Sequence, residues 1–130
     1  MTNSIPDMLH SDTYADLLGI RLESEDPVTV AMDIDERHLN FMGATHGGAL
    51  FSLADCALSL VSNRPGTAVA VDAHLVLTGA TGPGDMLTAV AEEMTRGRTL
   101  GSYRITVTRG DGRTVGLFTG TVAVVDQSGG

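Results

Sequence analysis

The stretch GGALFSLADCALSLV, at residues 47–61, is the longest apolar run of the chain. Its residues favour a helix, and the sequence NRPG at residues 63–66 ends it, because proline and glycine interrupt helices. Apolar side chains cover nearly every direction around such a helix, which is typical of a helix buried on all sides. We therefore predict a buried helix of about fifteen residues at the centre of the fold.

Strand patterns lie on both sides of this helix. Residues 28–34 alternate in the way that half-buried strands do. Four later segments are rich in Val, Thr, Ala and Leu and are separated by turn residues: 67–77, 85–96, 99–109 and 113–125. One strand, a long helix and four consecutive strands predict an α+β fold, in which a curved antiparallel sheet of about five strands wraps around the helix.

The remaining segments complete a single domain over residues 1–130. Residues 11–19 begin with polar capping residues and end with glycine, so we predict a short helix that serves as a lid or packing element. Residues 35–46 are predicted to form a loop, and residues 126–130 a disordered tail.

Composition excludes several classes of protein. The chain has 130 residues, of which 42% are apolar, so it can bury a core. Eight basic residues, all arginine, against 16 acidic ones give a net charge of −8, which argues against nucleic acid or an anionic membrane as a partner. The lack of lysine excludes P-loop NTPases and Schiff-base enzymes. A single cysteine, no signal peptide and no long apolar segment predict a cytoplasmic protein.

Motifs for metals, dinucleotides and serine nucleophiles are missing from the sequence. The four histidines and Cys56 lack the spacing of zinc ligands, so we expect no metal. Neither a GxGxxG segment that opens a helix nor a GxSxG elbow occurs. Cys56 lies among Ala and Leu and is expected in the core rather than as a nucleophile.

The predicted helix carries one polar stripe. Ser52, Asp55, Ser59 and Ser62 are spaced 3, 4 and 3 residues apart. At 100° per residue they lie within about 80° of one another. Within residues 38–63, Asp55 is the only Asp, Glu, Lys or Arg, and a buried carboxylate is costly unless it is hydrogen-bonded or functional. Two interpretations stay open: Asp55 bonds a backbone or serine group across an interface, or it serves a catalytic cavity.

Gly47 and Gly48 open the helix, where backbone N–H groups are free and the helix dipole is positive. Without side chains there, a carbonyl oxygen can approach the backbone as closely as an oxyanion hole requires. The plain alternative is a glycine turn before a helix. Gly47 and Asp55 are separated by about 12 Å along the helix axis, so they cannot act on the same atom. If both are catalytic, the helix pairs antiparallel with its copy in a dimer, with two equivalent sites at the interface.

Residues 40–55, NFMGATHGGALFSLAD, resemble the signature N-x-x-G-x-x-H-G-G-x-x-F-x-L-A-D of PaaI-type hotdog-fold acyl-CoA thioesterases. The resemblance extends to Ser62 and Asn63 at the helix end, to Gly84 and Asp85 before a strand, and to FTGT at residues 118–121. It implies a hotdog fold, a homodimer that pairs again into a homotetramer, and hydrolysis of an acyl-CoA thioester between two subunits.

The resemblance also implies roles for single residues. Asp55 matches the catalytic carboxylate, which acts as general base on water or as nucleophile through a mixed anhydride, and both roles stay open. Gly47 matches the residue whose N–H polarises the thioester carbonyl, and Asn40 the residue that orients the carbonyl or the water. His46 is expected to shape the loop and to hydrogen-bond near the sulfur, and Ser59 to position water.

Expected substrate contacts lie at both ends of the helix and in an arginine-rich segment. Gly48 and Asn63 are the candidates on the helix, by resemblance. Five of the eight arginines lie between residues 96 and 113, and we take Arg96 and Arg98 as candidates for binding the CoA phosphates. The alternative is that these arginines are solvated strand and turn residues.

The expected reaction converts acyl-CoA and water into a carboxylic acid and CoA. It needs no cofactor, because coenzyme A is part of the substrate. The resemblance favours phenylacetyl-CoA or another aryl acyl-CoA, with a medium-chain fatty acyl-CoA as the alternative. Two other interpretations are a hydratase or dehydratase on the same fold, which would not carry the motif at residues 40–55, and a non-catalytic acyl-CoA-binding dimer.

Overall fold

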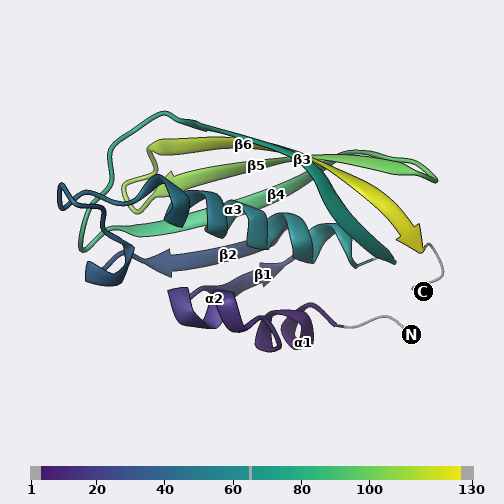
Figure 1. Cartoon of the computed structure of the whole chain (residues 1–130), viewed down its shortest axis with the longest axis horizontal. Coiled ribbons are helices and arrows are strands. Elements are labelled where there is room, and N and C mark those ends of the chain that lie inside the picture. The colour runs from purple at the N-terminus through teal and green to yellow at the C-terminus, as the bar shows by residue number, and fades with distance from the viewer. Residues whose placement is uncertain (1–3, 65, 127–130) are drawn as a thin grey trace.

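One long helix, α3 (Gly47–Ser62), lies at the centre of the computed structural model, which describes residues 4–64 and 66–126 (Figure 1). It begins at the predicted residue and ends one residue later than expected. Leu53, Ala54 and Ala57 on this helix are completely buried. The prediction of a buried central helix is therefore confirmed.

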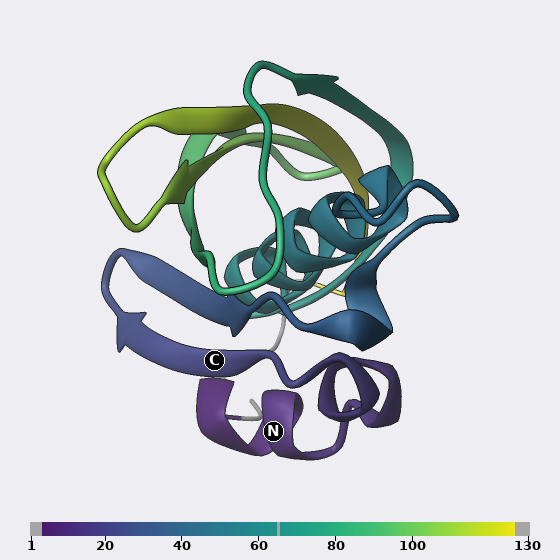
Figure 2. The same ribbon diagram turned by 90° about the vertical axis from the view of Figure 1, so that its left-hand side faces the viewer.

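Within the described residues, six strands form one antiparallel sheet in the order β1-β2-β4-β5-β6-β3. The end-on view in Figure 2 shows this sheet curling around α3. The strands are β1 (Arg21–Glu25), β2 (Val28–Asp33), β3 (Thr67–Leu77), β4 (Met86–Arg96), β5 (Leu100–Arg109) and β6 (Thr114–Asp126). The four strands after the helix and the strand before it are those that the sequence predicts.

The sheet has one strand more than the five expected, because β1 was not predicted. Three of its five residues are charged, namely Arg21, Glu23 and Glu25, so it lacks the apolar alternation of a half-buried strand. It nevertheless pairs antiparallel with β2 at the edge of the sheet, with Leu22 opposite Val30. Charged side chains are common on edge strands, since they discourage pairing with other chains.

From residue 4 onward, where the description begins, two short helices precede the sheet: α1 (Ile5–His10) and α2 (Thr13–Leu18). The second confirms the helix predicted within residues 11–19, whereas the first was not expected. The Ser4 side chain caps α1, and Asp12 caps α2 by accepting a hydrogen bond from the Ala15 N–H. Gly19 ends α2 with a φ of 74°, a left-handed conformation that glycine adopts readily. α1 contacts β1, and α2 contacts α3 (Figure 1).

The core fills the space between α3 and the concave face of the sheet. Leu53 and Leu58 of the helix pack with Leu87, Ile105 and Phe118 of the sheet, and all five are at most 1% exposed. Burying each such side chain stabilises the fold by roughly 1.5–3 kcal/mol. This packing fixes the rotation of α3 about its axis, and with it the face of the helix that is left uncovered.

β3 forms the opposite edge of the sheet, and β6 is its only partner in the described part of the chain. Val69, Val71, Val76 and Leu77 on this strand are each about half exposed. A long apolar edge strand with free backbone groups is a template for pairing with another strand. The edge formed by β3 is therefore available for pairing with a second chain.

The end of the chain is described as far as Asp126, the last residue of β6. The predicted disordered tail otherwise lies at residues 127–130, outside the described residues. None of the described helices is long and apolar enough to cross a membrane.

Candidate active site

The polar stripe of α3 faces a cavity rather than the sheet. Asp55 and Ser52 are partly buried and Ser59 is exposed, so these three residues form the open face of the helix. Ser62 does not belong to this face, because it is 1% exposed and its hydroxyl donates to the Leu58 carbonyl at 2.7 Å. The stripe predicted from residues 52 to 62 therefore ends at Ser59.

The Asp55 carboxylate has no hydrogen-bond partner among the described residues. Burial raises the pKa of Asp55 above its ordinary value, and the nearby charge of Asp12 raises it further. No serine or backbone group within the described part of this chain bonds Asp55, and the alternative of such a bond across an interface stays a prediction. A half-buried carboxylate with raised pKa that opens on a cavity has the properties of a general base or nucleophile.

In the first turn of α3, the N–H groups of Gly47 and Gly48 differ in their hydrogen bonding. His46 is the N-cap, and its Nδ1 atom accepts a hydrogen bond from the Gly48 N–H at 2.8 Å. A Cβ atom at position 48 would lie 2.9 Å from this Nδ1, so the glycine makes room for the ring. The Gly47 N–H has no acceptor among the described residues. Gly47, and not Gly48, therefore supplies the free donor at the positive end of the helix.

Asn40 shapes the loop that leads into α3. Its Oδ1 atom accepts hydrogen bonds from the N–H groups of Met42 and Ala44, at 2.9 and 3.1 Å. The loop turns at Gly43, whose φ is 78°, and it exposes 95% of Phe41. Within the described chain, Asn40 therefore stabilises the turn of this loop. Its expected role in orienting the carbonyl or the water stays a prediction.

A cavity of about 200 Å³ lies between α2 and the open face of α3. Tyr14 also lines a second cavity, of about 260 Å³, which contains His46 and Gly48. Tyr14 thus lies between the Asp55 side and the start of α3. The residues that line the first cavity are Asp12, Tyr14, Ala15, Ile20, Phe51, Ser52, Asp55, Cys56 and Ser59.

A model of the thioesterase superfamily matches residues 42–116, more than half of the chain. The chain belongs to the thioesterase superfamily. Acyl-coenzyme A thioesterase PaaI of Escherichia coli K12 is 36% identical to it over 116 residues, which are 87% of this chain and 83% of PaaI.

Solved structures agree with this family. The E. coli PaaI protein from the phenylacetic acid degradation operon has a TM-score of 0.86 at 35% identity, covering 91% of the thioesterase and 88% of that chain. A mutant of phenylacetic acid degradation protein PaaI from Thermus thermophilus has a TM-score of 0.85 at 35% identity, covering 88% and 100%. A hypothetical thioesterase from Streptococcus pneumoniae TIGR4, solved with coenzyme A, has a TM-score of 0.74 at 31% identity, covering 77% and 79%. The PaaI-type hotdog fold and the assignment as a hydrolase are confirmed.

Two residues that we predicted to contact the substrate of the thioesterase, Asn63 and Arg96, lie at the C-terminal end of α3. Their side chains form hydrogen bonds within the fold. Asn63 joins the helix to β3, because its Nδ2 donates to the Ser59 carbonyl and its Oδ1 accepts from the Ala68 N–H at 2.9 Å. Arg96 donates from Nη1 to the Ser62 carbonyl at 2.9 Å and to the Tyr103 hydroxyl at 2.8 Å. These hydrogen bonds stabilise the fold. A contact with CoA would have to use side-chain atoms that do not take part in them.

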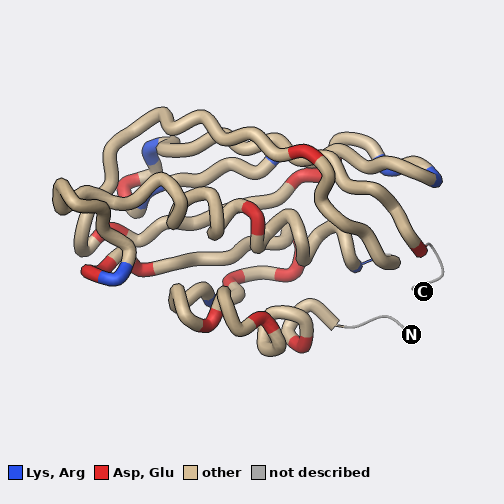
Figure 3. Tube along the Cα trace, viewed as in Figure 1, with Lys and Arg blue, Asp and Glu red and all other residues tan. Residues whose placement is uncertain are grey.

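Arg98 lies elsewhere, in the short turn between β4 and β5. Figure 3 shows positive charge at the tip of this hairpin, at the opposite end of the molecule from the start of α3. The structure therefore brings Asn40, His46, Gly47 and Gly48 together at one end of α3, and Asn63 and Arg96 at the other, whereas Arg98 lies apart in the hairpin turn. Asp55 and Ser59 lie between them.

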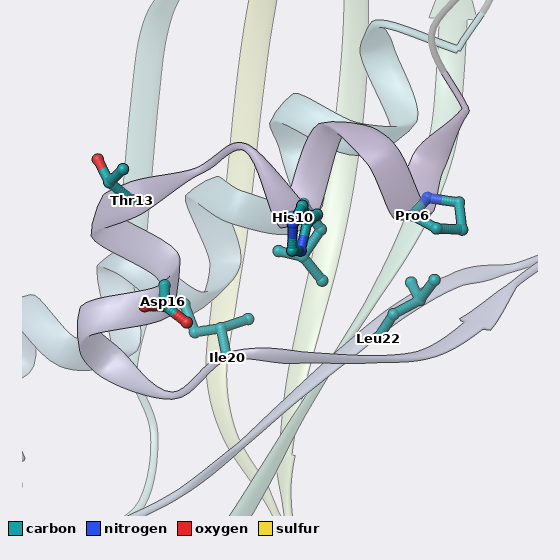
Figure 4. Close-up of a pocket in the computed structure, with 7 residues that line it drawn as sticks. Pro6, His10, Thr13, Asp16, Ile20 and Leu22 are labelled. Atoms are coloured by element: carbon teal, nitrogen blue, oxygen red, sulfur yellow. The ribbon is translucent and has the colours of Figure 1, made fainter.

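Sequence reasoning missed the contribution of α2 to this site. Asp12 and Tyr14 line the cavity beside Asp55, and only the interpretation of residues 11–19 as a lid pointed toward them. The opposite side of α2 faces a wider groove of about 440 Å³, whose lining includes His10 and Asp16 (Figure 4). That groove contains none of the predicted site residues.

Among the described residues, no group of three or more His, Cys, Asp or Glu side chains could hold a metal ion. Cys56 is buried in the core as expected, and burial raises the pKa of its thiol to about 12. The expected reaction without metal or cofactor stays a prediction.

Proposed function

We propose that this thioesterase hydrolyses acyl-CoA thioesters in sites shared between two subunits, with Asp55 of one subunit opposite Gly47 of the other. The observation that carries the proposal is the pair of unused groups on one helix. Asp55 is a half-buried carboxylate without a hydrogen bond, and Gly47 has a free N–H, within the described residues. They are separated by about 12 Å along α3, so each needs a complement from another chain.

The edge strand β3 supports the dimer. A two-fold axis beside it would pair β3 with its copy and place the two α3 helices antiparallel. Gly47 lies close to this edge, since a Cβ atom at position 47 would lie 3.3 Å from Leu77 Cδ1 at the end of β3. Pairing through β3 would bring the partner to the start of α3. A further pairing into a homotetramer, in the cytoplasm, is proposed from the family resemblance.

In the proposed reaction the ionised Asp55 takes a proton from water while the water oxygen attacks the thioester carbonyl. The Gly47 N–H stabilises the charge that develops on the carbonyl oxygen. The C–S bond then breaks, and the thiolate takes up a proton to leave as CoA. As a nucleophile, Asp55 would instead attack the carbonyl itself, and water would hydrolyse the mixed anhydride. Asn40 and Ser59 are proposed to orient the carbonyl and the water.

Hydrogen bonding fixes how His46 can contribute. Because Nδ1 accepts from the Gly48 N–H, the neutral ring carries its proton on Nε2. Nε2–H is thus a donor that can face the thioester sulfur or the leaving thiolate. We propose this role for His46, together with the capping of α3.

An aryl acyl group suits the cavity beside Asp55. Tyr14, Ile20 and Phe51 supply apolar walls, and the Phe51 ring packs edge-on against Phe118 with centroids 5.3 Å apart. Aromatic side chains favour offset or edge-on contact with another ring. The operon named for E. coli PaaI supports phenylacetyl-CoA, and a medium-chain fatty acyl-CoA is the alternative.

Binding of the CoA moiety is proposed at the two ends of α3. The Streptococcus pneumoniae relative was solved with coenzyme A, which supports CoA as part of the substrate. In an antiparallel dimer, the far end of one α3 lies near the start of the other. Arg98, Arg96 and Asn63 of one subunit would then lie near the partner's Gly48. The two arginines could bind the phosphates of CoA there.

The test is thiol release from a panel of aryl and fatty acyl-CoA thioesters, with wild type beside Asp55→Ala. We expect turnover that Asp55→Ala lowers by at least about 10²-fold, the scale of a lost general base. Faster turnover of aryl substrates would support the proposed specificity, and faster turnover of fatty acyl substrates would favour the alternative. Wild-type rates in a folded Asp55→Ala protein would remove the mechanism.

A further inference from the structure

Two carboxylates face the cavity between α2 and α3. Asp55 reaches it from the middle of α3, and Asp12 from the start of α2. The cavity has a volume of only about 200 Å³, and both residues are partly buried. Two negative charges that share a small and partly desolvated space interact more strongly than they would in water.

The Asp12 carboxylate is held in place by its own helix. Its Oδ1 atom accepts a hydrogen bond of 2.9 Å from the Ala15 N–H. The other end of α2 is held by two side chains from η1 (Glu36–His38), a 3-10 helix between β2 and α3. Arg37 donates to the Leu17 carbonyl at 3.0 Å, and the buried His38 donates from Nε2 to the Leu18 carbonyl at 2.8 Å. Asp12 is therefore a fixed neighbour of the cavity.

No positive group neutralises this pair among the described residues that line the cavity. The other titratable groups there are Tyr14 on α2 and Cys56 on α3, and burial raises the pKa of the Cys56 thiol to about 12, so it carries no charge near neutrality. Arg37 lines the neighbouring cavity and is paired with Asp35 at 3.1 Å. Figure 3 shows acidic residues and no Lys or Arg on α1 and α2, and His10 at the end of α1 lines the groove on the other side of α2.

We propose that Asp12 is a positioning residue that acts on Asp55 through its charge and so sets the pH range in which the thioesterase works. The inference rests on the proposed function, in which Asp55 must be ionised. A fixed negative charge disfavours ionisation of Asp55, and it makes the ionised carboxylate a stronger base. The raised pKa of Asp55 agrees with this, with burial as its larger cause and Asp12 as the second.

The informative variant is Asp12→Asn in the full chain. Asparagine removes the charge and keeps the N-cap, because it is as good a capping residue as aspartate. Asp12→Ser is a second capping variant without charge. Asp16→Asn is the matched control, since Asp16 lies on the same helix but lines the groove on the other side (Figure 4).

Two measurements test the proposal. Carbon-13 NMR of the Asp55 carboxyl gives its titration midpoint without any need for turnover, and the pH profile of kcat/KM gives the acid limb. We expect both to move to lower pH in Asp12→Asn and Asp12→Ser and to stay in place in Asp16→Asn. An unchanged Asp55 midpoint in the two capping variants would overturn the proposal. A shifted midpoint in a protein without thioesterase activity would support the coupling and count against the proposed function alone.

Discussion

The Nδ1 atom of His46 accepts a hydrogen bond from the Gly48 N–H at 2.8 Å, and this contact decides which N–H at the start of α3 stays free. A methyl group at position 48 would lie 2.9 Å from the same Nδ1 atom. The ring must then move, and the helix loses its cap.

Gly48→Ala should therefore destabilise the protein by about 0.5–2 kcal/mol, the usual value of an N-cap. Urea unfolding measures this change. Gly82→Ala is the control, because nothing lies within 4 Å of its added Cβ. Equal stability of Gly48→Ala and wild type would show that the ring does not depend on the glycine.

Gly47→Pro removes the free N–H and should lower kcat by roughly 10²–10³-fold, as the loss of an oxyanion-hole donor does. Proline is favoured at the first position of a helix, so α3 should still form. Gly47→Ala keeps the N–H, and its Cβ would contact only the end of the Leu77 side chain, so it should retain most of the activity. Steady-state kinetics on both variants checks this. Full activity of Gly47→Pro would exclude this N–H as the donor.

Tyr14→Ala should widen the cavity beside Asp55 and lower kcat/KM for phenylacetyl-CoA by about 10-fold or more, with a smaller loss for a medium-chain acyl-CoA, because an aromatic wall is lost. Leu17→Ala on the same helix is the control, since Leu17 is 65% exposed and lines neither cavity. Equal losses for both substrates would assign Tyr14 a general structural role.

Cys56 should not react with a chromogenic thiol reagent in the native protein at pH 8. Burial raises the pKa of its thiol to about 12, so the reactive thiolate is almost absent at this pH. After denaturation the single cysteine of the chain should release one equivalent of chromophore. Reaction of the native protein at the denatured rate would place Cys56 at the surface.

Most of the fold could be predicted, because most helices and strands have a local sequence pattern that identifies them. The all-round apolar run from Gly47 and the stop at residues 63–66 defined α3, and the Val- and Thr-rich segments defined β3 to β6. β1 was missed because its charged residues follow no apolar alternation, and only pairing with β2 makes it a strand.

The candidate site could be predicted only in part. Asp55 stood out because it is the one charge in a long apolar segment. Ser62 was placed on the same stripe by angle, yet it bonds its own helix on the buried side. Two other features depend on contacts between distant segments: Arg96 caps the end of α3, and Asp12 lies beside Asp55 at the cavity. A sequence gives the charge of such a residue but not the position of its side chain in the fold.

The most direct test of the shared site mixes two inactive variants, Asp55→Asn and Gly47→Pro, under conditions that allow subunit exchange. In a mixed dimer, one site combines an intact Gly47 with an intact Asp55 from the other subunit, and the second site carries both substitutions. With half of the dimers mixed, activity should return to about a quarter of the wild-type rate. If both residues act within a single chain, the mixture stays as inactive as the separate variants, and the active site does not lie between subunits.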